Sequence, residues 1–179
     1  MQDGVTIRAS TDEDLAAITA IYGHHVRHGT ASFELDPPTL AEMTARRAAI
    51  LAKGMPYLVA ADGTTVLGYT YAGPYRPRPA YADTVENSIY MRHDLTGRGV
   101  GRLLLTALVT ACADLGLRQM VAVVGDSANQ PSIRLHERCG FRRVGTLTAV
   151  GWKFGRWLDS VMLQRALGDG DRTPPTRPH

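Results

Sequence analysis

The feature that most restricts the fold is a segment in which a strand-like run enters a glycine-rich turn and passes at once into an amphipathic helix. The run begins at Glu86, and the turn reads Gly97-Arg98-Gly99-Val100-Gly101. Glycine lets the backbone approach a ligand closely, and the first N–H groups of a helix have no partner within the helix. Together with the helix dipole, these donors form an anion site that suits a pyrophosphate. The segment therefore predicts a phosphate-binding turn between a strand and a helix.

The order of residues in this turn excludes two common phosphate-binding motifs. A P-loop ends in Gly-Lys-Ser/Thr, whereas this turn ends in Gly101-Arg102-Leu103. A Rossmann turn needs the spacing G-x-G-x-x-G and an acidic residue that closes the next strand, and neither is present. Arg98 and Arg102 add positive charge beside the turn. Taken alone, the turn is also compatible with a tight strand-to-helix connection that binds nothing.

Hydrophobic periodicity predicts strands and helices along the rest of the chain. Strands are expected at Val5–Ala9, Tyr57–Ala61, Val66–Ala72, Thr84–Arg92, Gln119–Val124, Arg142–Leu147 and Leu158–Gln164. Helices are expected from a Ser10–Glu13 capping box through Val26, from Pro37 to Gly54, over Val100–Leu115 with Leu103, Leu104 and Leu108 in its apolar stripe, and over Ser132–Arg138. A stiff loop outside the sheet is expected over Gly73–Ala80, which contains three prolines. This order predicts an α/β fold, a mixed sheet of about seven strands with helices on both faces.

Composition agrees with one globular domain. The 179 residues are 44% hydrophobic and 21% charged, and 20 Lys+Arg against 17 Asp+Glu give a net charge of +3. A single domain is expected over residues 1–167. Residues 168–179 are rich in proline and lack aliphatic and aromatic side chains, so they are expected to form a disordered tail.

Charge and cysteine content restrict the partners and the compartment. Lys53 and Lys153 are the two lysines, so arginine carries most of the positive charge, which favours an anionic ligand. The arginines are spread along the chain, which argues against nucleic acid. The chain has no run of 18 apolar residues and no signal-peptide pattern, so no membrane association is expected. Two cysteines, Cys112 and Cys139, do not make a secreted disulfide scaffold, and the cytoplasm is the expected location.

Two motifs in succession resemble those of the GNAT superfamily of N-acetyltransferases. The glycine turn is similar to the acyl-CoA pyrophosphate loop Q/R-x-x-G-x-G/A, although Thr96 stands at its first position. Residues 129–141, NQPSIRLHERCGF, resemble the second motif N-x-x-S/A-x-x-L-Y/H-E-K/R-x-G-F. The resemblance implies the GNAT fold and acetyl-CoA as co-substrate, without a metal.

Further segments are similar to the phosphinothricin and methionine sulfoximine acetyltransferase subgroup. They are TVENSIY at 84–90, the Arg76-Pro77 loop and VGWKFGRWLD at 150–159, and the resemblance spans Ile7–Leu167. It implies transfer of acetyl to the α-amino group of a small amino-acid analogue, namely phosphinothricin, methionine sulfoximine or methionine sulfone. It also implies a homodimer, for which the region Trp152–Trp157 is a candidate interface. Lys153 and Arg156 in that region are either substrate contacts or supports of the sheet edge or of a dimer face.

Two residues are candidates for catalysis. Glu86 lies in a strand that is otherwise largely apolar, where burial is costly for a carboxylate and raises its pKa. The resemblance assigns the general base to this glutamate, acting directly or through one water; the alternative is an ion pair with Arg76, Arg78 or Arg92. His136 stands where many GNAT members carry a tyrosine thought to protonate the leaving sulfur. It is therefore either a general acid or a contact of the cofactor and a helix cap.

Substrate and cofactor contacts follow from the same segments. Tyr75, Arg76, Pro77 and Arg78 form a stiff, arginine-bearing loop that would bind a carboxylate or phosphinate, unless the arginines are merely solvated. Together with Glu86, Asn87 and Ser88 they are the expected substrate contacts. The expected cofactor contacts are Ile89, Tyr90 and Met91, with a main-chain N–H for the oxyanion, then Gly97, Arg98, Gly99, Val100, Gly101 and Arg102, and finally Asn129, Ser132 and His136. His24, His25 and His28 lack the ligands that would complete a metal site.

Two other functions are open to a chain with these features. One is the same acyl transfer to another small amine or to a protein N-terminus, although an arginine-lined loop disfavours polycationic acceptors. The other is a non-catalytic CoA-binding protein, which would have no need of a carboxylate at Glu86.

Overall fold

The computed structural model describes residues 4–95 and 99–175, and its strands form one seven-stranded sheet. The strands are β1 Val5–Ala9, β2 Tyr57–Asp62, β3 Thr65–Pro74, β4 Thr84–Met91, β5 Gln119–Gly125, β6 Arg142–Lys153 and β7 Arg156–Ala166. They stand in the order β1-β2-β3-β4-β5-β7-β6, and neighbours are antiparallel except for the parallel pair β4–β5. The mixed sheet of seven strands predicted from the sequence is confirmed.

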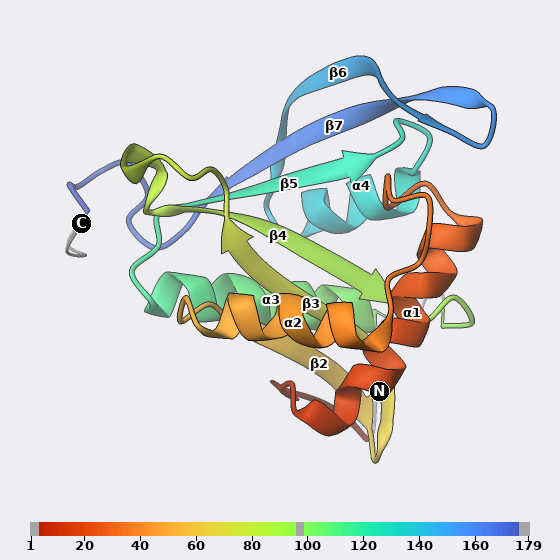
Figure 1. Ribbon diagram of the computed structural model, residues 1–179. Coiled ribbons are helices and arrows are strands. Elements are labelled where there is room, and N and C mark those ends of the chain that lie inside the picture. The colour runs from red at the N-terminus through yellow and green to blue at the C-terminus, as the bar shows by residue number, and fades with distance from the viewer. Residues whose placement is uncertain (1–3, 96–98, 176–179) are drawn as a thin grey trace.

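Helices cover both faces of this sheet. They are α1 Leu15–His28, α2 Leu40–Leu51, α3 Val100–Asp114 and α4 Gln130–Arg138, with short 3-10 turns η1 Asp12–Asp14 and η2 Pro79–Tyr81. Helices α1 and α2 pack together on one face, and α3 and α4 lie on the other (Figure 1). Ile18, Val26 and Tyr69 belong to the core under α1 and α2, whereas Leu105 and Met120 belong to the core under α3 and α4. No helix in the described part of the chain has the length and apolar composition needed to cross a membrane.

The first helical segment is capped one residue later than expected. Thr11 N–H donates to Asp14 Oδ2 at 2.7 Å, so the capping box is Thr11–Asp14 and the Ser10–Glu13 box is wrong. The Ser10 hydroxyl is instead used by a distant partner, because Arg47 Nε donates to it at 2.7 Å. A contact between residues this far apart in sequence has no local signal.

Helix α2 begins at Leu40 and not at Pro37. Thr39 is the N-cap: its N–H donates to Glu42 Oε2 at 2.7 Å, and Glu42 N–H donates to Thr39 Oγ1 at 3.2 Å. This reciprocal pair satisfies two N–H donors at the helix start, which a proline at the first helical position does not do.

Three further details differ from the sequence-based expectations. Strand β3 continues to Pro74, so the start of the expected Gly73–Ala80 loop is paired, with Gly73 opposite Glu86. The β6–β7 hairpin is longer than expected and turns between Lys153 and Arg156. In α3, Leu104 and Leu108 are buried as expected, but Leu103 is 44% exposed and Leu105 is fully buried, so Leu105 and not Leu103 completes the buried stripe.

The segment after β7 makes defined contacts as far as it is described. Arg118 Nη2 donates to Thr173 Oγ1 at 2.9 Å and to the Pro174 carbonyl at 2.6 Å. Leu167, the last residue of the expected domain, is buried. Residues 176–179 of the expected tail lie outside the described residues, and the domain limits stay a prediction.

The parallel pair β4–β5 sets the position of the site. The two strands are paired only from Thr84–Gln119 to Asn87–Ala122, although β4 continues to Met91 and β5 to Gly125. Beyond Asn87 the two strands are no longer paired, so the sheet has a gap between the ends of β4 and β5.

Candidate active site

A cavity of about 440 Å³ lies at the gap where β4 and β5 diverge. It reaches from the α1–α2 side of the sheet to the α4 side. Its walls come from four places, namely Tyr22 with the loop residues 31–34; residues 86–90 of β4; residues 123–125 of β5 with Ser160 of β7; and Asn129, Ser132 and His136 at the start of α4. Six of the residues predicted from the sequence to bind substrate or cofactor, Asn87, Ser88, Ile89, Tyr90, Asn129 and Ser132, and both candidate catalytic residues therefore meet in one place.

Glu86 presents a carboxylate without a partner to this cavity. Its side chain is on the same face of β4 as Ser88 and Tyr90, on the side of α1 and α2. Among the described residues it forms no salt bridge, because Arg92 pairs with Asp94 and the Arg76 guanidinium lies over the rings of Tyr75 and Tyr81. Burial raises the pKa of Glu86 above its ordinary value of 4.5. A carboxylate with a raised pKa that faces a cavity is suited to accept a proton.

Asn87 and His136 form a buried pair on the opposite side of β4. Asn87 Nδ2 lies 3.0 Å from His136 Nε2, and His136 Nδ1 lies 2.8 Å from the Ser132 carbonyl oxygen. Because a carbonyl only accepts, Nδ1 carries the proton, and Nε2 is left to accept from the Asn87 amide. Burial lowers the pKa of His136, although the Ser132 contact partly opposes this shift. The Asn87 Oδ1 atom is buried and makes no hydrogen bond to a described residue.

Two main-chain N–H groups of β4 face the gap. Arg92 N–H donates to the Leu67 carbonyl of β3, and residues of the same parity on β4 bond to β3. The backbone groups of Ile89 and Met91 therefore point to the other side, towards β5, which has already diverged. The Met91 carbonyl accepts from His25 Nε2 at 2.7 Å, a contact that the sequence did not indicate. The two N–H groups are left as fixed donors.

The start of α3 has the form expected of an anion site. Gly99 is the N-cap in a left-handed conformation, with φ of 72°, and no side chain caps the first turn. A Cβ on Gly101 would lie 3.4 Å from Leu135 and 3.7 Å from Met91, so the helix start packs closely against α4 and β4. Val100 is buried and Arg102 is exposed. The predicted contacts Gly97 and Arg98, together with Thr96, lie outside the described residues.

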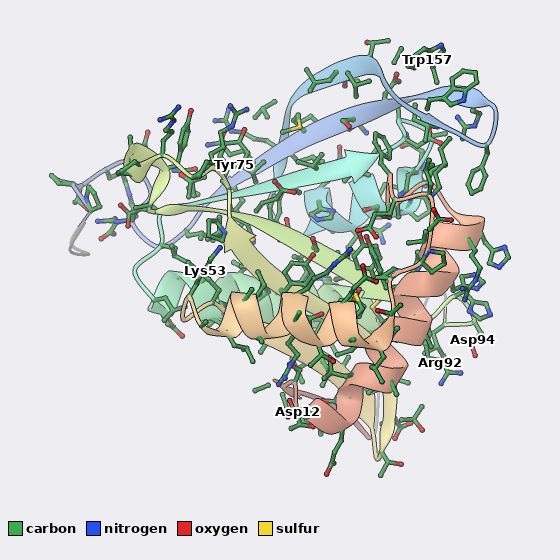
Figure 2. All side chains as sticks on the ribbon, in the orientation of Figure 1. Asp12, Lys53, Tyr75, Arg92, Asp94 and Trp157 are labelled. Atoms are coloured by element: carbon green, nitrogen blue, oxygen red, sulfur yellow. The ribbon has the colours of Figure 1, made fainter. Side chains whose placement is uncertain are left out.

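The predicted arginine loop does not line the cavity. Tyr75, Arg76, Pro77 and Arg78 follow β3 directly, at the Glu86 end of β4, because Gly73 is paired with Glu86. Figure 2 shows Tyr75 on the left, where β3 ends, and Arg92 on the lower right, past the opposite end of β4. Arg76 and Arg78 are both exposed. Their role in substrate binding stays a prediction.

A wall that the sequence did not indicate comes from the loop between α1 and α2. The Tyr22 hydroxyl lies 2.8 Å from Ser32 Oγ and 2.9 Å from Glu34 Oε1, which also accepts from Arg46 at 2.6 Å. Burial raises the pKa of Tyr22 to about 12. The tyrosine therefore stays protonated and holds the loop against α1.

The tip of the β6–β7 hairpin holds the same loop from the other side. Lys153 is 3% exposed, and its Nζ donates to the Gly29 carbonyl at 2.9 Å and to the Ser32 carbonyl at 2.7 Å. Burial lowers the pKa of Lys153, and the charge of Glu34 partly restores it. Lys153 does not line the cavity, and its contacts are with the α1–α2 loop, which was not expected from the sequence. No periodic pattern predicts contacts across more than a hundred residues.

Asp126 provides a second support for this loop. Burial raises the pKa of Asp126, but hydrogen bonds from Ala128 N–H, Arg156 and Thr30 outweigh burial and hold the pKa below its usual range. The Arg156 guanidinium forms an ion pair with this carboxylate. Arg156 thus contacts the loop after β5 and, through Asp126, the α1–α2 loop.

We expect Gly125→Ala to displace the α1–α2 loop. A Cβ on Gly125 would lie 2.3 Å from the Thr30 carbonyl oxygen and 2.9 Å from the Phe33 ring, which is closer than the packing allows. The free energy of unfolding should fall by about 1–3 kcal/mol, measured by urea denaturation. Gly145→Ala is the matched control, because nothing lies within 4 Å of its Cβ position. Equal stability of the two variants would show that the loop is not packed as described.

The described residues contain no group of three or more His, Cys, Asp and Glu side chains that could hold a metal ion. His24 stacks on His93 with ring centroids 3.9 Å apart, and His25 is bonded to Met91. The reactive features are thus an unpaired carboxylate, two main-chain donors and a helix start. Such a site is suited to acyl transfer, in which a nucleophile loses a proton and a carbonyl oxygen gains charge.

Comparison with known proteins agrees with this class of enzyme. The family model described as "Acetyltransferase (GNAT) family" matches residues 18–141, and the chain belongs to this family. It is 54% identical over 170 residues to a phosphinothricin N-acetyltransferase of Alcaligenes faecalis, covering 95% of this chain and 86% of that protein. It is 42% identical over 171 residues to an L-methionine sulfoximine/L-methionine sulfone acetyltransferase of Pseudomonas aeruginosa, covering 95% and 98%.

A solved structure shares the whole architecture. The crystal structure of a phosphinothricin acetyltransferase of Sinorhizobium meliloti, in complex with acetyl-CoA, has a TM-score of 0.93 and 44% sequence identity. The match covers 97% of this chain and 94% of that one. The expected GNAT fold is confirmed, and the relatives are enzymes that transfer acetyl groups.

Proposed function

We propose that this enzyme transfers an acetyl group from acetyl-CoA to the α-amino group of a small amino-acid analogue, with Glu86 as general base. Phosphinothricin, methionine sulfoximine and methionine sulfone are the acceptors suggested by the names of its relatives. The observation that carries the proposal is the unpaired, half-buried Glu86 carboxylate in the cavity between β4 and β5.

The residues present fit acetyl-CoA, which supplies the acetyl group as a thioester. The uncapped start of α3 at Gly99 offers N–H donors for the pyrophosphate, and the buried Oδ1 of Asn87 offers an acceptor for an amide of the pantetheine arm. The N–H groups of Ile89 and Met91 face the gap and would stabilise the carbonyl oxygen as it gains negative charge. Fixed main-chain donors need no reorganisation during the reaction.

Glu86 takes up the proton that the amine must lose. The nitrogen forms a bond to the acetyl carbon, the carbon–sulfur bond breaks, and the proton passes to the Glu86 carboxylate directly or through one water. CoA would leave as the thiolate, with the electrons of the broken carbon–sulfur bond, and take a proton from the solvent. A carboxylate with a raised pKa is a stronger acceptor than a solvated one near neutral pH.

For His136 we propose a positioning role. Its Nδ1 proton is held by Ser132, and its Nε2 lone pair accepts from Asn87. Burial lowers the pKa of the ring, so the neutral form dominates at pH 7. In that form neither nitrogen has a free proton for the leaving sulfur, which favours a contact that orients Asn87 over general acid catalysis.

The proposed function is tested by a screen of acceptors with release of free CoA as the readout. We expect release with methionine sulfoximine, methionine sulfone or phosphinothricin. We expect none with spermidine, because the exposed guanidinium groups of Arg76 and Arg78 at the Glu86 end of β4 would repel a polycation. Release with spermidine or a peptide N-terminus alone would assign a different acceptor. Absence of release with every amine would leave a CoA-binding protein without activity.

We also propose a homodimer formed through the β6–β7 hairpin. Trp152 and Trp157 are 57% and 62% exposed and pack edge to face, 5.2 Å between ring centroids, while Phe154 is 56% exposed. Large side chains exposed together indicate an interaction surface. Sedimentation velocity should give the mass of two chains, and Trp157→Glu should shift the protein to one chain, whereas Leu51→Glu on the far side of the sheet should not. An unchanged mass of the Trp157 variant would exclude this surface.

We also propose a role for the arginine loop, a compartment and the domain limits. Arg76 and Arg78 stand at the Glu86 end of β4, where their charges would attract the carboxylate of an incoming amino acid. Both cysteines are free and buried, which agrees with a reducing compartment such as the cytoplasm. One domain over residues 1–167 accounts for the core clusters.

A further inference from the structure

Met91, the last residue of β4, lies where the two proposed parts of the acetyl-CoA site meet. Its main-chain N–H faces the gap beside β5 and is one of the two donors proposed for the thioester carbonyl. Its side chain reaches the start of α3, because a Cβ on Gly101 would lie 3.7 Å from Met91 Cγ. It also packs against β3, where a Cβ on Gly68 would lie 2.5 Å from Met91 Sδ. A shift of Met91 would therefore disturb both the thioester donor and the helix start proposed to bind the pyrophosphate.

The Met91 carbonyl has no partner on β5. In the described sheet β4 and β5 are paired only as far as Asn87 and Ala122. The carbonyl of a strand residue points to the same edge of the strand as its N–H, so the Met91 carbonyl also points to the unpaired side. A partly buried carbonyl without a hydrogen bond is unfavourable. The end of β4 therefore needs a donor from another part of the fold.

His25 of α1 supplies that donor. Its Nε2 lies 2.7 Å from the Met91 carbonyl oxygen, and Nε2 carries a proton because a carbonyl only accepts. The imidazole is partly buried and contacts the Tyr90 ring, with centroids 5.5 Å apart. His25 is not among the residues that line the cavity between β4 and β5. It thus takes the place of a β5 residue and acts on the site through Met91.

The adjacent residue of α1 holds the chain beyond β4. The His24 ring stacks on His93, with centroids 3.9 Å apart and an angle of 14° between the planes. Figure 2 shows Arg92 and Asp94, on either side of His93 in the sequence, beside α1. From β3, the Leu67 carbonyl accepts from Arg92 N–H at 2.9 Å. The segment that leaves β4 is therefore held by α1 and by β3.

We infer that His25 is a positioning residue for acetyl-CoA, which holds Met91 so that the donors of β4 and the start of α3 keep a fixed spacing. The inference rests on the proposed acetyl transfer and adds a residue of α1 to it. Fixed main-chain donors stabilise charge without the cost of reorganisation. Loss of the His25 hydrogen bond should release Met91 and weaken cofactor binding, while the acceptor wall at residues 31–34 stays in place.

Calorimetric titration with CoA tests this role without turnover. His25→Phe keeps a ring beside Tyr90 but loses the donor, so we expect the Kd for CoA to rise about five- to tenfold. In His25→Gln the side-chain amide has an N–H donor at about the same reach as Nε2, and the Kd should stay close to that of the wild type. His28→Phe is the matched control, because His28 is exposed near the end of α1 and its ring contact is with His24. Its Kd should equal that of the wild type.

Steady-state kinetics separates positioning from general damage to α1. His25→Phe should raise the KM for acetyl-CoA by about the same factor as the Kd for CoA and leave the KM for L-methionine sulfone unchanged. His25→Asn has an amide one methylene shorter than that of glutamine, which falls short of the Met91 carbonyl. It should behave like His25→Phe, and it takes the place of that variant if the phenylalanine prevents folding.

A wild-type Kd in His25→Phe and His25→Asn would overturn the inference, and so would an equally raised Kd in His25→Gln. An equal rise of both KM values in His25→Phe would also overturn it, because the effect would then not be confined to the cofactor. A wild type that binds CoA but acetylates no amine would refute the proposed transfer alone, since the Kd values still decide the role of His25. A wild type that does not bind CoA would refute both.

Discussion

Glu86→Gln is expected to lower kcat by roughly 10²- to 10⁴-fold, the usual contribution of a general base. The amide keeps the shape of the side chain and cannot accept the amine proton. The KM for acetyl-CoA should stay unchanged, because the groups proposed to bind it, at Gly99, Asn87 and Ile89, are untouched. Glu137→Gln is the control, since Glu137 pairs with Arg143 at the surface and does not line the cavity.

The pH dependence supplies a second readout of the same residue. Burial raises the pKa of Glu86, and the base is active only when ionised, so kcat/KM should fall as the pH drops through a value above 4.5. That acid limb should be weakened or displaced in Glu86→Gln. A variant with undiminished turnover and an unchanged limb would remove Glu86 from the mechanism.

Stability distinguishes a catalytic Glu86 from a structural one. A carboxyl whose pKa is raised on folding is ionised more readily in the unfolded chain, so its ionisation at pH 7 destabilises the folded state. Glu86→Gln should therefore unfold at the same or a higher urea concentration than the wild type at pH 7. A marked loss of stability would indicate that Glu86 has a structural partner in solution.

Lys153→Met is expected to raise the KM for the amino-acid acceptor about tenfold and to leave the KM for acetyl-CoA unchanged. The ammonium group holds the carbonyls of Gly29 and Ser32, and so fixes the loop that forms one wall of the cavity. Without it, two buried carbonyls lose their charged partner, and the free energy of unfolding should fall by about 1–3 kcal/mol. Urea denaturation and steady-state kinetics with each substrate varied in turn measure the two effects.

Lys53→Met is the control for this variant. Lys53 is the other lysine of the chain and is exposed at the end of α2. It should match the wild type in stability and in both KM values. An unchanged acceptor KM in Lys153→Met, or an equal rise in both KM values, would contradict a specific effect on the acceptor wall.

The architecture could be predicted from the sequence because its signals are local. The alternation of apolar and polar residues along β2 and β4 and the apolar stripe of α3 can each be recognised from the residues of that element alone. The order of these elements along the chain then predicted the mixed sheet. The errors lie where a distant residue decides a local choice. Arg47 donates a hydrogen bond to the Ser10 hydroxyl, and the helix is capped by Thr11 instead of Ser10.

The candidate site could be predicted in part for the same reason. Glu86, Asn87 and His136 lie in motifs that are recognisable along the chain, and the structure brings them to one cavity. The wall formed by Ser32 and Glu34 was missed, because it depends on Lys153 reaching across 121 residues of sequence. In the sequence, Lys153 is visible only as a lysine between two aromatic residues at a strand end. That pattern does not indicate which carbonyls it binds.

The separation of β4 from β5 after Asn87 has a consequence for evolution and engineering. A substitution that lengthens the pairing of these strands would add hydrogen bonds and raise the melting temperature. It would also close the gap beside the one parallel strand pair of the described sheet, where we propose that acetyl transfer takes place. Selection for thermal stability alone would therefore favour an inactive protein in which β4 and β5 are paired along their whole length. Variants obtained by such selection should be assayed for turnover before they are kept.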